Sequence, residues 1–513
     1  MGDITAAQEI AAGYATEGAA LELGTVLIDG AVDPTARVRI PFATLNRHGL
    51  VAGATGTGKT KTLQGLAEQL SAAGVPVLLA DVKGDLSGLA RAGESNPKIE
   101  SRAVDTGDDW VPTAFPVEFL SLGGGSSAVP IRATITQFGP ILLSKVLDLN
   151  DTQESTLGLI FHWADQRGLP LLDIKDLRAV IQHLTSDEGK ADLKGLGGVS
   201  PATAGVILRA LVNLEVRGGE AFFGEPEFEP SDLLRQVDGR GVVTLLELAD
   251  QQADPRLFST FLMWLLAELF EELPEAGDLD KPKLVFFFDE AHLLFNDASK
   301  AFLERIEQTV KLIRSKGVGV FFCTQLPTDV PNAVLSQLGA RIQHALRAFT
   351  PEDQAALAKT VKTYPTTRNY ELDEALTSLG TGEAIITVLS ERGAPTPVAW
   401  ARMRAPRSLM AAIGTDAVTA AAKASPLYAR YGETIDRESA YEKLTAKIAE
   451  APAPAPADAP APPAPEPERR AEREEPGFLE KAFDSPVVKS FLRSAASALG
   501  REITRGLFGT RRR

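Results

Sequence analysis

Residues 50–60 read Leu50-Val51-Ala52-Gly53-Ala54-Thr55-Gly56-Thr57-Gly58-Lys59-Thr60, and the architecture predicted for the chain is built around them. Residues 49–52 predict a buried strand, and the chain after the stretch predicts a helix whose apolar side carries Leu63, Leu66, Ala67 and Leu70. Residues 53–60 match G-x-x-x-x-G-K-[ST], a loop whose backbone N–H groups wrap phosphates at a helix N-terminus. A glycine turn that matches by chance is the alternative, and eight ordered positions between a strand and an amphipathic helix disfavour it. The stretch therefore predicts a nucleoside triphosphate site.

Residues 53–60 are called the phosphate loop below, and its residues have distinct expected roles. Lys59 is placed to neutralise charge on the β- and γ-phosphates, and the Thr60 hydroxyl is placed to ligate Mg²⁺. The predicted cofactors are ATP and Mg²⁺. The residues expected to contact the nucleotide are Gly53, Ala54, Thr55, Gly56, Thr57, Gly58, Lys59, Thr60 and Lys61.

The composition is that of an ordinary globular protein, with 44% hydrophobic and 24% charged residues in 513. A net charge of −15 argues against a protein that is basic all over, although it leaves room for a local basic channel. A single cysteine, Cys323, fits a reducing cytosol. Residues 1–20 lack the pattern of a secretory signal, and the apolar run 257–270 is too short to span a bilayer. We therefore expect a cytoplasmic protein.

Two short strands, 24–29 and 37–41, are expected before the phosphate loop, joined by a turn at Asp33-Pro34. Residues 75–80 predict a strand after the first helix, which completes a βαβ unit and makes the sheet at least partly parallel. Residues 102–105 are expected to form a further strand. Later elements are expected at 242–246 and 318–323 (strands), 258–270 and 300–315 (helices), and 384–389 with 398–403 (a closing hairpin).

The predicted fold class is α/β, with a mostly parallel sheet, a helical insertion and a disordered linker to a C-terminal helix. Helical periodicity predicts the insertion, and alternating Ala and Pro predict the linker. The expected divisions are an N-terminal β lead-in (1–45), the first part of the core (46–138), the helical insertion (139–235), the second part of the core (236–410), a helical extension (411–450), the Pro/Ala linker (451–467) and an amphipathic, basic C-terminal helix (468–513).

Acidic residues follow a second buried strand, 284–288. Asp289 is expected to hold the Mg²⁺ shell, and Glu290 to orient and polarise the attacking water. The second carboxylate favours an ATPase over a phosphotransferase; two acidic residues that merely cap a helix are the alternative. Gln325, directly after the strand 318–323, is expected to sense the γ-phosphate; a plain strand-end turn is the less favoured alternative.

An arginine that stabilises the transition state is harder to locate. Arg314, Arg341 and Arg347 all lie near the last core strands, and one of them could reach the γ-phosphate of a neighbouring subunit. Of the three we favour Arg341 and Arg314. The five histidines are dispersed and show no metal-ligand spacing.

Several of these segments together resemble the HerA/FtsK branch of RecA-like P-loop ATPases, and most closely the bacterial HerA-like YjgR family. Residues 48–60 resemble the first motif of that branch, and Asp81-Val82-Lys83-Gly84-Asp85 its D-x-K-G-[DE] element. Residues 288–292 and 323–327 resemble its Walker B and glutamine motifs. The resemblance covers residues 20–405 and implies a RecA-like P-loop NTPase core, a homo-hexameric ring with ATP between subunits, an arginine supplied in trans, and DNA in the pore.

The chain departs from the DNA-pumping members in two respects. It has only the short lead-in where archaeal HerA proteins have a large β-barrel, and no winged-helix DNA reader is recognisable at its C-terminal end. Two hypotheses therefore stand: a ring-forming DNA translocase or helicase, or an ATPase that drives assembly or remodelling of a protein or membrane complex. The DNA hypothesis is supported by a basic cluster formed by Lys311, Arg314 and Lys316. The assembly hypothesis is supported by residues 468–513, which are expected to bind a protein or membrane-surface partner.

Overall fold

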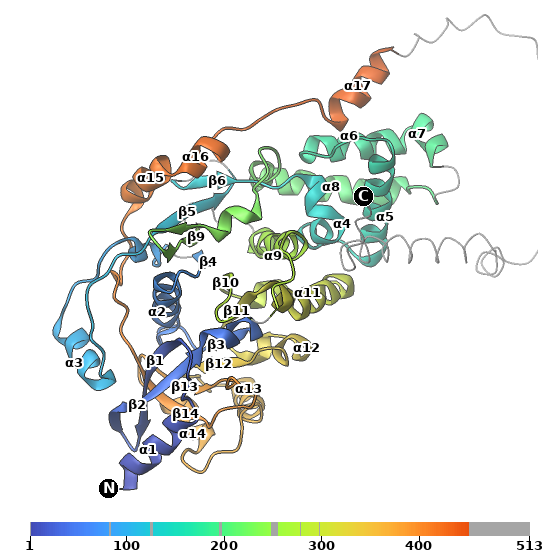
Figure 1. The fold of residues 1–513 in the computed structure, drawn as a ribbon. Coiled ribbons are helices and arrows are strands. Elements are labelled where there is room, and N and C mark those ends of the chain that lie inside the picture. Colours follow the sequence, from blue (N-terminus) through green and yellow to red (C-terminus); the bar gives the residue numbers. More distant parts are fainter. Residues whose placement is uncertain are drawn as a thin grey trace, which may run out of the picture. The chain divides into compact units, whose positions relative to one another are not determined.

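A twelve-stranded sheet runs through the part of the chain that the structure describes (Figure 1). The structure is a computed structural model, and it describes residues 2–81, 84–123, 127–193, 197–247, 255–277, 279–296 and 298–450. The strand order is β2-β1-β14-β13-β12-β3-β11-β10-β4-β9-β5-β6. The strands are β1 (Ala20–Ile28), β2 (Ala31–Pro41), β3 (Gly49–Ala52), β4 (Val77–Asp81), β5 (Val117–Leu122), β6 (Val129–Ile131), β9 (Val243–Glu247), β10 (Leu284–Phe288), β11 (Val318–Thr324), β12 (Ala340–Gln343), β13 (Glu383–Thr387) and β14 (Ala399–Met403), and β7 (Gln236–Val237) with β8 (Arg240–Gly241) form a separate ribbon.

The sheet is mostly parallel, as predicted. From β12 through β3, β11, β10, β4, β9 and β5 to β6, each strand runs parallel to its neighbour. The strands β13, β14, β1 and β2 continue the sheet in antiparallel pairs, and β13 with β14 forms the predicted closing hairpin. The phosphate-loop strand β3 therefore lies in the interior of the sheet, between β12 and β11.

Helices cover both faces of the sheet. Alternation along β3 sends Leu50 and Ala52 to one apolar cluster and Val51 to another, so the strand is buried on both sides. The second cluster is covered by α1 (Gly2–Ala12) and α2 (Lys59–Ala72), and the first by α9 (Pro255–Glu272) and α11 (Lys300–Ile313). The other helices that frame the sheet are α3 (Pro97–Thr106), α10 (His292–Phe295), α12 (Asn332–Leu335), α13 (Pro351–Val361) and α14 (Leu372–Ser378).

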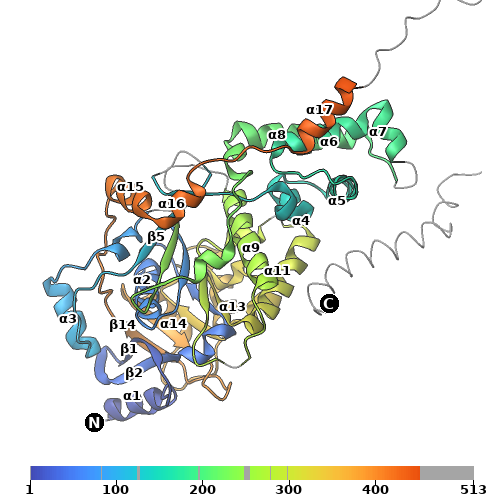
Figure 2. The ribbon, with the colours of Figure 1, turned by 45° about the horizontal axis from the view of Figure 1, so that its top comes forward.

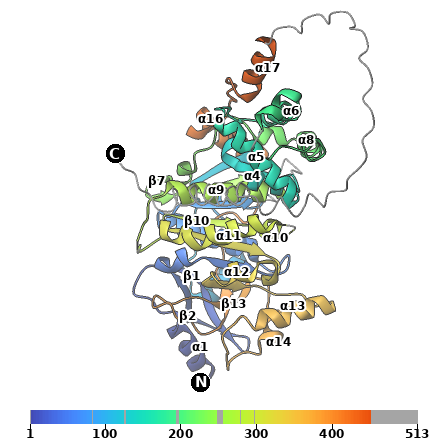
Figure 3. The same cartoon turned by 90° about the vertical axis from the view of Figure 1, so that its right-hand side faces the viewer.

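A group of helices from the middle of the chain packs beyond α9. It comprises α4 (Ile135–Val146), α5 (Asp151–Gln166), α6 (Ile174–Thr185), α7 (Asp187–Asp192) and α8 (Pro201–Val216). The helix α4 packs against both α9 and α11, and Figure 3 shows α4, α5, α6 and α8 gathered above α9. Buried residues of this group join the same apolar cluster as the sheet face beneath α9, so the helices extend the core.

The last described helices return along the sheet edge to this helical group. They are α15 (Thr415–Ala424), α16 (Pro426–Tyr431) and α17 (Ala440–Glu450). The Ala440 N–H donates to the Pro170 carbonyl at 3.1 Å, and the Tyr441 N–H donates to Asp176 Oδ1 of α6 at 2.8 Å. Figure 2 shows α17 beside α6 as a result.

Two local predictions are wrong. Residues 102–105 lie in α3 rather than in a strand, because Asn96 caps this helix: its Oδ1 accepts from the Lys98 N–H at 3.0 Å, and Pro97 occupies the first turn. The lead-in hairpin turns at Asp29 and Gly30, both with positive φ, rather than at Asp33-Pro34. A two-residue turn of that kind matches the twist of the strands it joins, so β1 and β2 are longer than expected.

The linker and C-terminal helix predicted for 451–467 and 468–513 lie outside the described residues. Among the helices that are described, none combines the length and the apolar character needed to cross a membrane.

The pH dependence of stability is expected to reflect Glu268 on α9. Partial burial, with Glu271, Glu227 and Glu272 nearby, raises its pKa to about 8, and the pKa of Glu227 is raised to about 7. A raised carboxyl pKa favours the folded state fully below the ordinary pKa, and this contribution is lost as the pH rises through 8. Thermal unfolding should therefore show Tm falling from pH 5 to 9. In the Glu268→Gln protein the fall should be smaller, by an amount that corresponds to roughly 1–3 kcal/mol of unfolding free energy.

Glu304→Gln, an exposed carboxylate on α11, is the matched control and should leave the slope unchanged. An unaltered slope in the Glu268→Gln protein would contradict the role of Glu268.

Candidate functional site

The phosphate loop holds a backbone conformation that side chains rarely adopt. The φ angles are 151° at Gly53, 81° at Gly56 and 118° at Gly58. A Cβ added at Gly53 would lie 2.6 Å from His344 Cβ, and one at Gly58 would lie 3.1 Å from the Gly382 backbone nitrogen. Glycine is therefore required at Gly53 and Gly58 for two separate reasons, backbone conformation and space.

Backbone hydrogen bonds hold the loop from three neighbouring segments. The Gly53 N–H donates to the Thr324 carbonyl at the end of β11 at 3.2 Å, and the Ala54 N–H donates to the Ala345 carbonyl beyond β12 at 2.8 Å. From the start of β13, the Gly382 N–H donates to the Thr57 carbonyl at 3.0 Å. The shape of the loop is thus fixed by strands on both of its flanks.

The loop opens onto the start of α2. No side chain caps this helix among the described residues, so the N–H groups of its first turn face the loop. The Lys59 Nζ donates to the Gly53 carbonyl, which places a cationic group across the mouth of the loop. N–H groups, the positive end of a helix and an ammonium group together make a site for an anion of several charges.

The carboxylates Asp289 and Glu290 lie at the same edge of the sheet. Phe288 pairs with Phe322, and Thr324 pairs with Ala52, so β10, β11 and β3 end together. Both carboxylates are half-buried, and Asp289 Oδ1 accepts from the Glu290 N–H at 2.9 Å.

Glu290 has a φ of 48°, and its Oε2 lies 3.4 Å from His292 Nδ1. A left-handed backbone at a residue other than glycine is a conformation that clusters at functional sites.

Lys59, Asp289 and Glu290 all act electrostatically on Cys323, near the end of β11. Burial raises the pKa of the Cys323 thiol on β11, and the charges of these three residues act on the same thiol. One short strand end is therefore within electrostatic reach of the loop lysine and both carboxylates.

Gln325 is exposed directly after β11. The turn that presents it is fixed by Asp329, whose Oδ2 accepts from the Thr324 hydroxyl at 2.5 Å and from the Leu326 N–H at 3.0 Å. This places Gln325 at the same sheet edge as Asp289.

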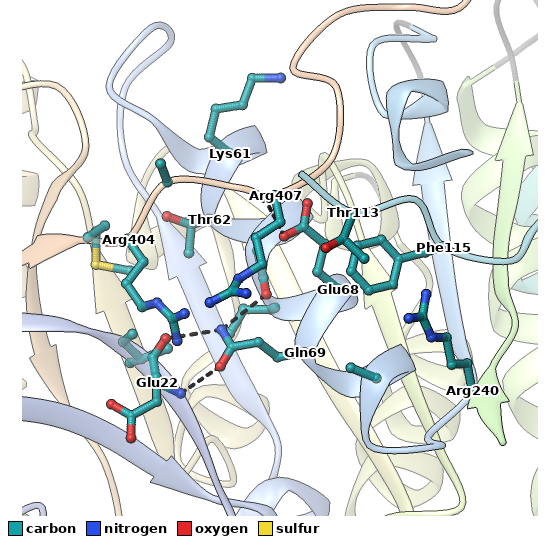
Figure 4. A pocket seen from close by; sticks show the side chains of 16 residues that line it. Glu22, Lys61, Thr62, Glu68, Gln69, Thr113, Phe115, Arg240, Arg404 and Arg407 are labelled. Atoms are coloured by element: carbon teal, nitrogen blue, oxygen red, sulfur yellow. Dashed lines mark hydrogen bonds between the residues drawn. The ribbon is translucent and has the colours of Figure 1, made fainter. Parts of the chain in front are cut away.

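The side chain of Lys61, a residue predicted to contact the nucleotide, points away from the phosphate loop. Its Nζ donates to Gln64 Oε1 at 3.1 Å and to the Met410 carbonyl at 3.2 Å. Figure 4 shows it at one end of a cleft of about 350 Å³ along α2, which Glu68 and Arg407 also line. Burial lowers the pKa of Lys61.

The three candidate arginines fall into two groups. Arg314 is exposed just before β11, and Arg341 is the second residue of β12, where its Nη1 donates to the Thr363 carbonyl at 2.9 Å. Both are near the amino ends of their strands, away from the phosphate loop of their own chain. Their expected role concerns a neighbouring copy and stays a prediction. Arg347 does reach its own loop, because its Nη2 donates to the Thr55 carbonyl at 3.2 Å.

His344 is a site residue that sequence reasoning missed. Its Nδ1 lies 2.8 Å from the Glu383 carbonyl, and its Nε2 lies 2.9 Å from the Thr62 hydroxyl of α2. Burial lowers its pKa to about 4, so the ring is neutral at pH 7 and serves as a hydrogen-bonding brace beneath the loop. Its position directly after a strand that runs parallel to β3 is the signal that could have found it.

The residues present fit a magnesium nucleotide. The glycine-lined loop and Lys59 provide for the phosphates, and the Thr60 hydroxyl and the Asp289 carboxylate are oxygen ligands of the kind that Mg²⁺ prefers. Fold and site together define a P-loop nucleoside triphosphatase. The family model described as "Helicase HerA-like C-terminal" matches residues 28–513, and the chain belongs to this family.

Known proteins agree with this assignment. The chain is 24% identical over 373 residues to the DNA double-strand break repair helicase HerA of Sulfurisphaera tokodaii, covering 71% of this chain and 66% of that one. It is 31% identical over 157 residues to the probable helicase MJECL08 of Methanocaldococcus jannaschii, covering 29% and 28%. The chain thus spans less than two thirds of the length of either relative.

Among solved structures, the plasmid coupling protein TrwB in complex with ADP and Mg²⁺ is similar in fold. The TM-score is 0.52 at 15% identity, over 79% of this chain and 95% of that one.

Gly58→Ala is expected to weaken nucleotide binding. The added Cβ would occupy a left-handed backbone and press on Gly382, and a strain of about 1–3 kcal/mol corresponds to roughly 5- to 150-fold in Kd. Titration with a fluorescent ATP analogue measures this. Gly65→Ala, inside α2 with open space around the added Cβ, is the control and should bind normally. Equal affinity of the two variants would refute the steric role of Gly58.

Proposed function

We propose that this chain hydrolyses ATP with Mg²⁺ in the cytoplasm and that a ring of its copies uses the energy to move DNA. The observation that carries the proposal is that β3 and β10 end at the same edge of the sheet, where the phosphate loop with Lys59 and the carboxylates Asp289 and Glu290 follow them. The single cysteine, Cys323, is consistent with a reducing compartment.

In the proposed mechanism the chain positions the reactants and supplies charge. The phosphate loop and Lys59 bind the β- and γ-phosphates, and Lys59 offsets negative charge that develops on them. Glu290 orients a water molecule and accepts its proton as the water oxygen bonds to the γ-phosphorus and the bond to the bridging oxygen breaks. Thr60 and Asp289 would hold Mg²⁺, which would supply further charge neutralisation when bound. In this proposal Gln325 senses the loss of the γ-phosphate.

DNA as the substrate is supported by the family and by the relative from Sulfurisphaera tokodaii, the DNA double-strand break repair helicase HerA. The cluster Lys311, Arg314 and Lys316 is the feature of this chain that suits a polyanion. Lys311 and Arg314 are exposed, whereas Lys316 Nζ is engaged by Glu275 at 3.2 Å. Phosphate contacts of this kind make affinity fall with salt.

A second candidate is an ATPase that drives assembly or remodelling of a protein or membrane complex without DNA. The net charge of −15 favours it, because an acidic protein repels nucleic acid except where local basic residues prevail. Residues 468–513, which end in basic residues, are the segment proposed to bind such a partner.

Glu290→Gln is expected to retain ATP binding and to lose steady-state hydrolysis by about two to four orders of magnitude, because the group that activates water is removed. Lys59→Ala should lose nucleotide binding as well. Phosphate release and nucleotide titration distinguish the two. Glu304→Gln, exposed on α11, should turn over ATP normally. Normal turnover in the Glu290→Gln protein would overturn the proposed mechanism.

ATP turnover of the native chain should rise with added DNA, and more at 50 mM than at 200 mM salt. Comparing single- and double-stranded DNA under both conditions measures this. Robust turnover that is indifferent to DNA would instead favour the assembly ATPase.

Arg314→Ala is expected to reduce turnover by roughly 10³- to 10⁵-fold if Arg314 acts in trans on a neighbour's γ-phosphate. Mixing Arg314→Ala with Lys59→Ala protein should then restore part of the activity, since some interfaces combine an intact loop with an intact arginine. A mixture as inactive as its components would argue against Arg314.

A further inference from the structure

Phe349 is an apolar side chain displayed on the surface of the protein. It is 85% exposed, although most large apolar side chains of the described chain are buried. Its backbone is held in place: the Phe349 N–H donates to Asp353 Oδ2 at 3.1 Å, and the Thr350 N–H donates to the same oxygen at 3.0 Å. This oxygen belongs to the capping box that starts α13, so the ring projects from an anchored backbone.

The segment that carries Phe349 flanks the phosphate loop. Ala345 accepts a hydrogen bond from the Ala54 N–H, and the Arg347 guanidinium donates to the Thr55 carbonyl at the tip of the loop. Beneath them, His344 packs against Gly53 and Gly58. Residues 345–347 therefore form one side wall of the site, and Phe349 lies two residues beyond the arginine that touches the loop.

The sheet order decides which end of a nucleotide meets this wall. Asp289 and Glu290 follow β10, which lies on the β11 side of β3, whereas residues 345–349 follow β12 on the other side. The γ-phosphate must lie toward the carboxylates that act on it, so the nucleoside, at the opposite end of the triphosphate, leaves the loop on the β12 side.

We infer that the Phe349 ring stacks on the base of the bound nucleotide, and that Arg347 holds this wall against the phosphate loop. The inference rests on the proposed function, since it assigns a base-binding residue to the same ATP site. An aromatic face in contact with a base recognises its π-surface rather than its hydrogen-bonding edge. The site should therefore gain affinity for purine nucleotides from Phe349 without strong discrimination between ATP and GTP.

The test compares ligands with and without a base on the full-length chain. Competition against a fluorescent nucleotide gives Kd values for ATP, GTP and inorganic tripolyphosphate. Phe349→Ala should raise the Kd for ATP and GTP by roughly 5- to 150-fold, the factor that corresponds to about 1–3 kcal/mol of stacking. The Kd for tripolyphosphate should stay unchanged. Phe349→Trp should retain ATP affinity and report binding through quenching of the new indole. Val216→Ala, which removes an 82% exposed side chain of α8, is the matched control.

The outcomes separate this inference from the proposed function. Lys59→Ala should lose affinity for ATP and for tripolyphosphate alike. A native chain that binds neither ligand would overturn the proposed function itself. Native binding of ATP with no loss in Phe349→Ala would overturn the stacking role alone. Equal losses of affinity for ATP and for tripolyphosphate in Phe349→Ala would also overturn it, because they would indicate damage to the phosphate loop. A change in oligomeric mass with unchanged ATP affinity would assign the ring to a contact between copies of this chain, and would refute base stacking.

Discussion

The closure of the phosphate loop between two strands is the constraint on which the rest of the site depends. The loop conformation is available because glycine occupies positions with φ of 151° and 118°, and it is kept because β11 and the segment after β12 each bond its backbone. These two contacts also position the chemistry. The β11 side carries the turn with Gln325 and lies next to Asp289, and the β12 side carries His344 and Arg347. One backbone arrangement therefore fixes both walls of the site.

The helical group is connected to the carboxylate side of the site. The buried Lys145 of α4 donates to the Asn296 carbonyl, a few residues after Glu290, and the Ser299 hydroxyl donates to Glu154 Oε2 of α5 at 3.1 Å. Burial raises the pKa of Glu154. These contacts join the segment after Asp289 and Glu290 to helices that come from a distant part of the sequence, so the helical group belongs to the environment of the candidate site.

Local patterns allowed the centre of the fold to be predicted, and contacts between distant segments explain the remainder. The β10 strand was predicted at its exact bounds because a fully apolar run ends at two carboxylates. The prediction of a strand at 102–105 was wrong because the Asn96 cap, which starts a helix, outweighs a short run of strand-like residues. His344 was missed because its role comes from contacts with distant backbone, at Gly53 and Glu383, and its position directly after a strand parallel to β3 is the only sequence signal that points to it. Lys61 adjoins the motif but faces residue 410, since the helix turns its side chain away from the loop.

The distribution of buried polar anchors indicates which side of the site can move. The helix α2 is tied along its length: buried Gln64 donates to the Ser408 hydroxyl at 2.7 Å, and Glu68, only 3% exposed, accepts from the Arg407 and Ser408 N–H groups at 2.8 and 2.9 Å. Breaking these bonds would leave a buried carboxylate without donors, which is costly. The turn around Gln325, in contrast, is held mainly by the half-buried Asp329, and Gln325 itself is exposed. A change of nucleotide state is therefore more readily relayed through the β11 side than through α2.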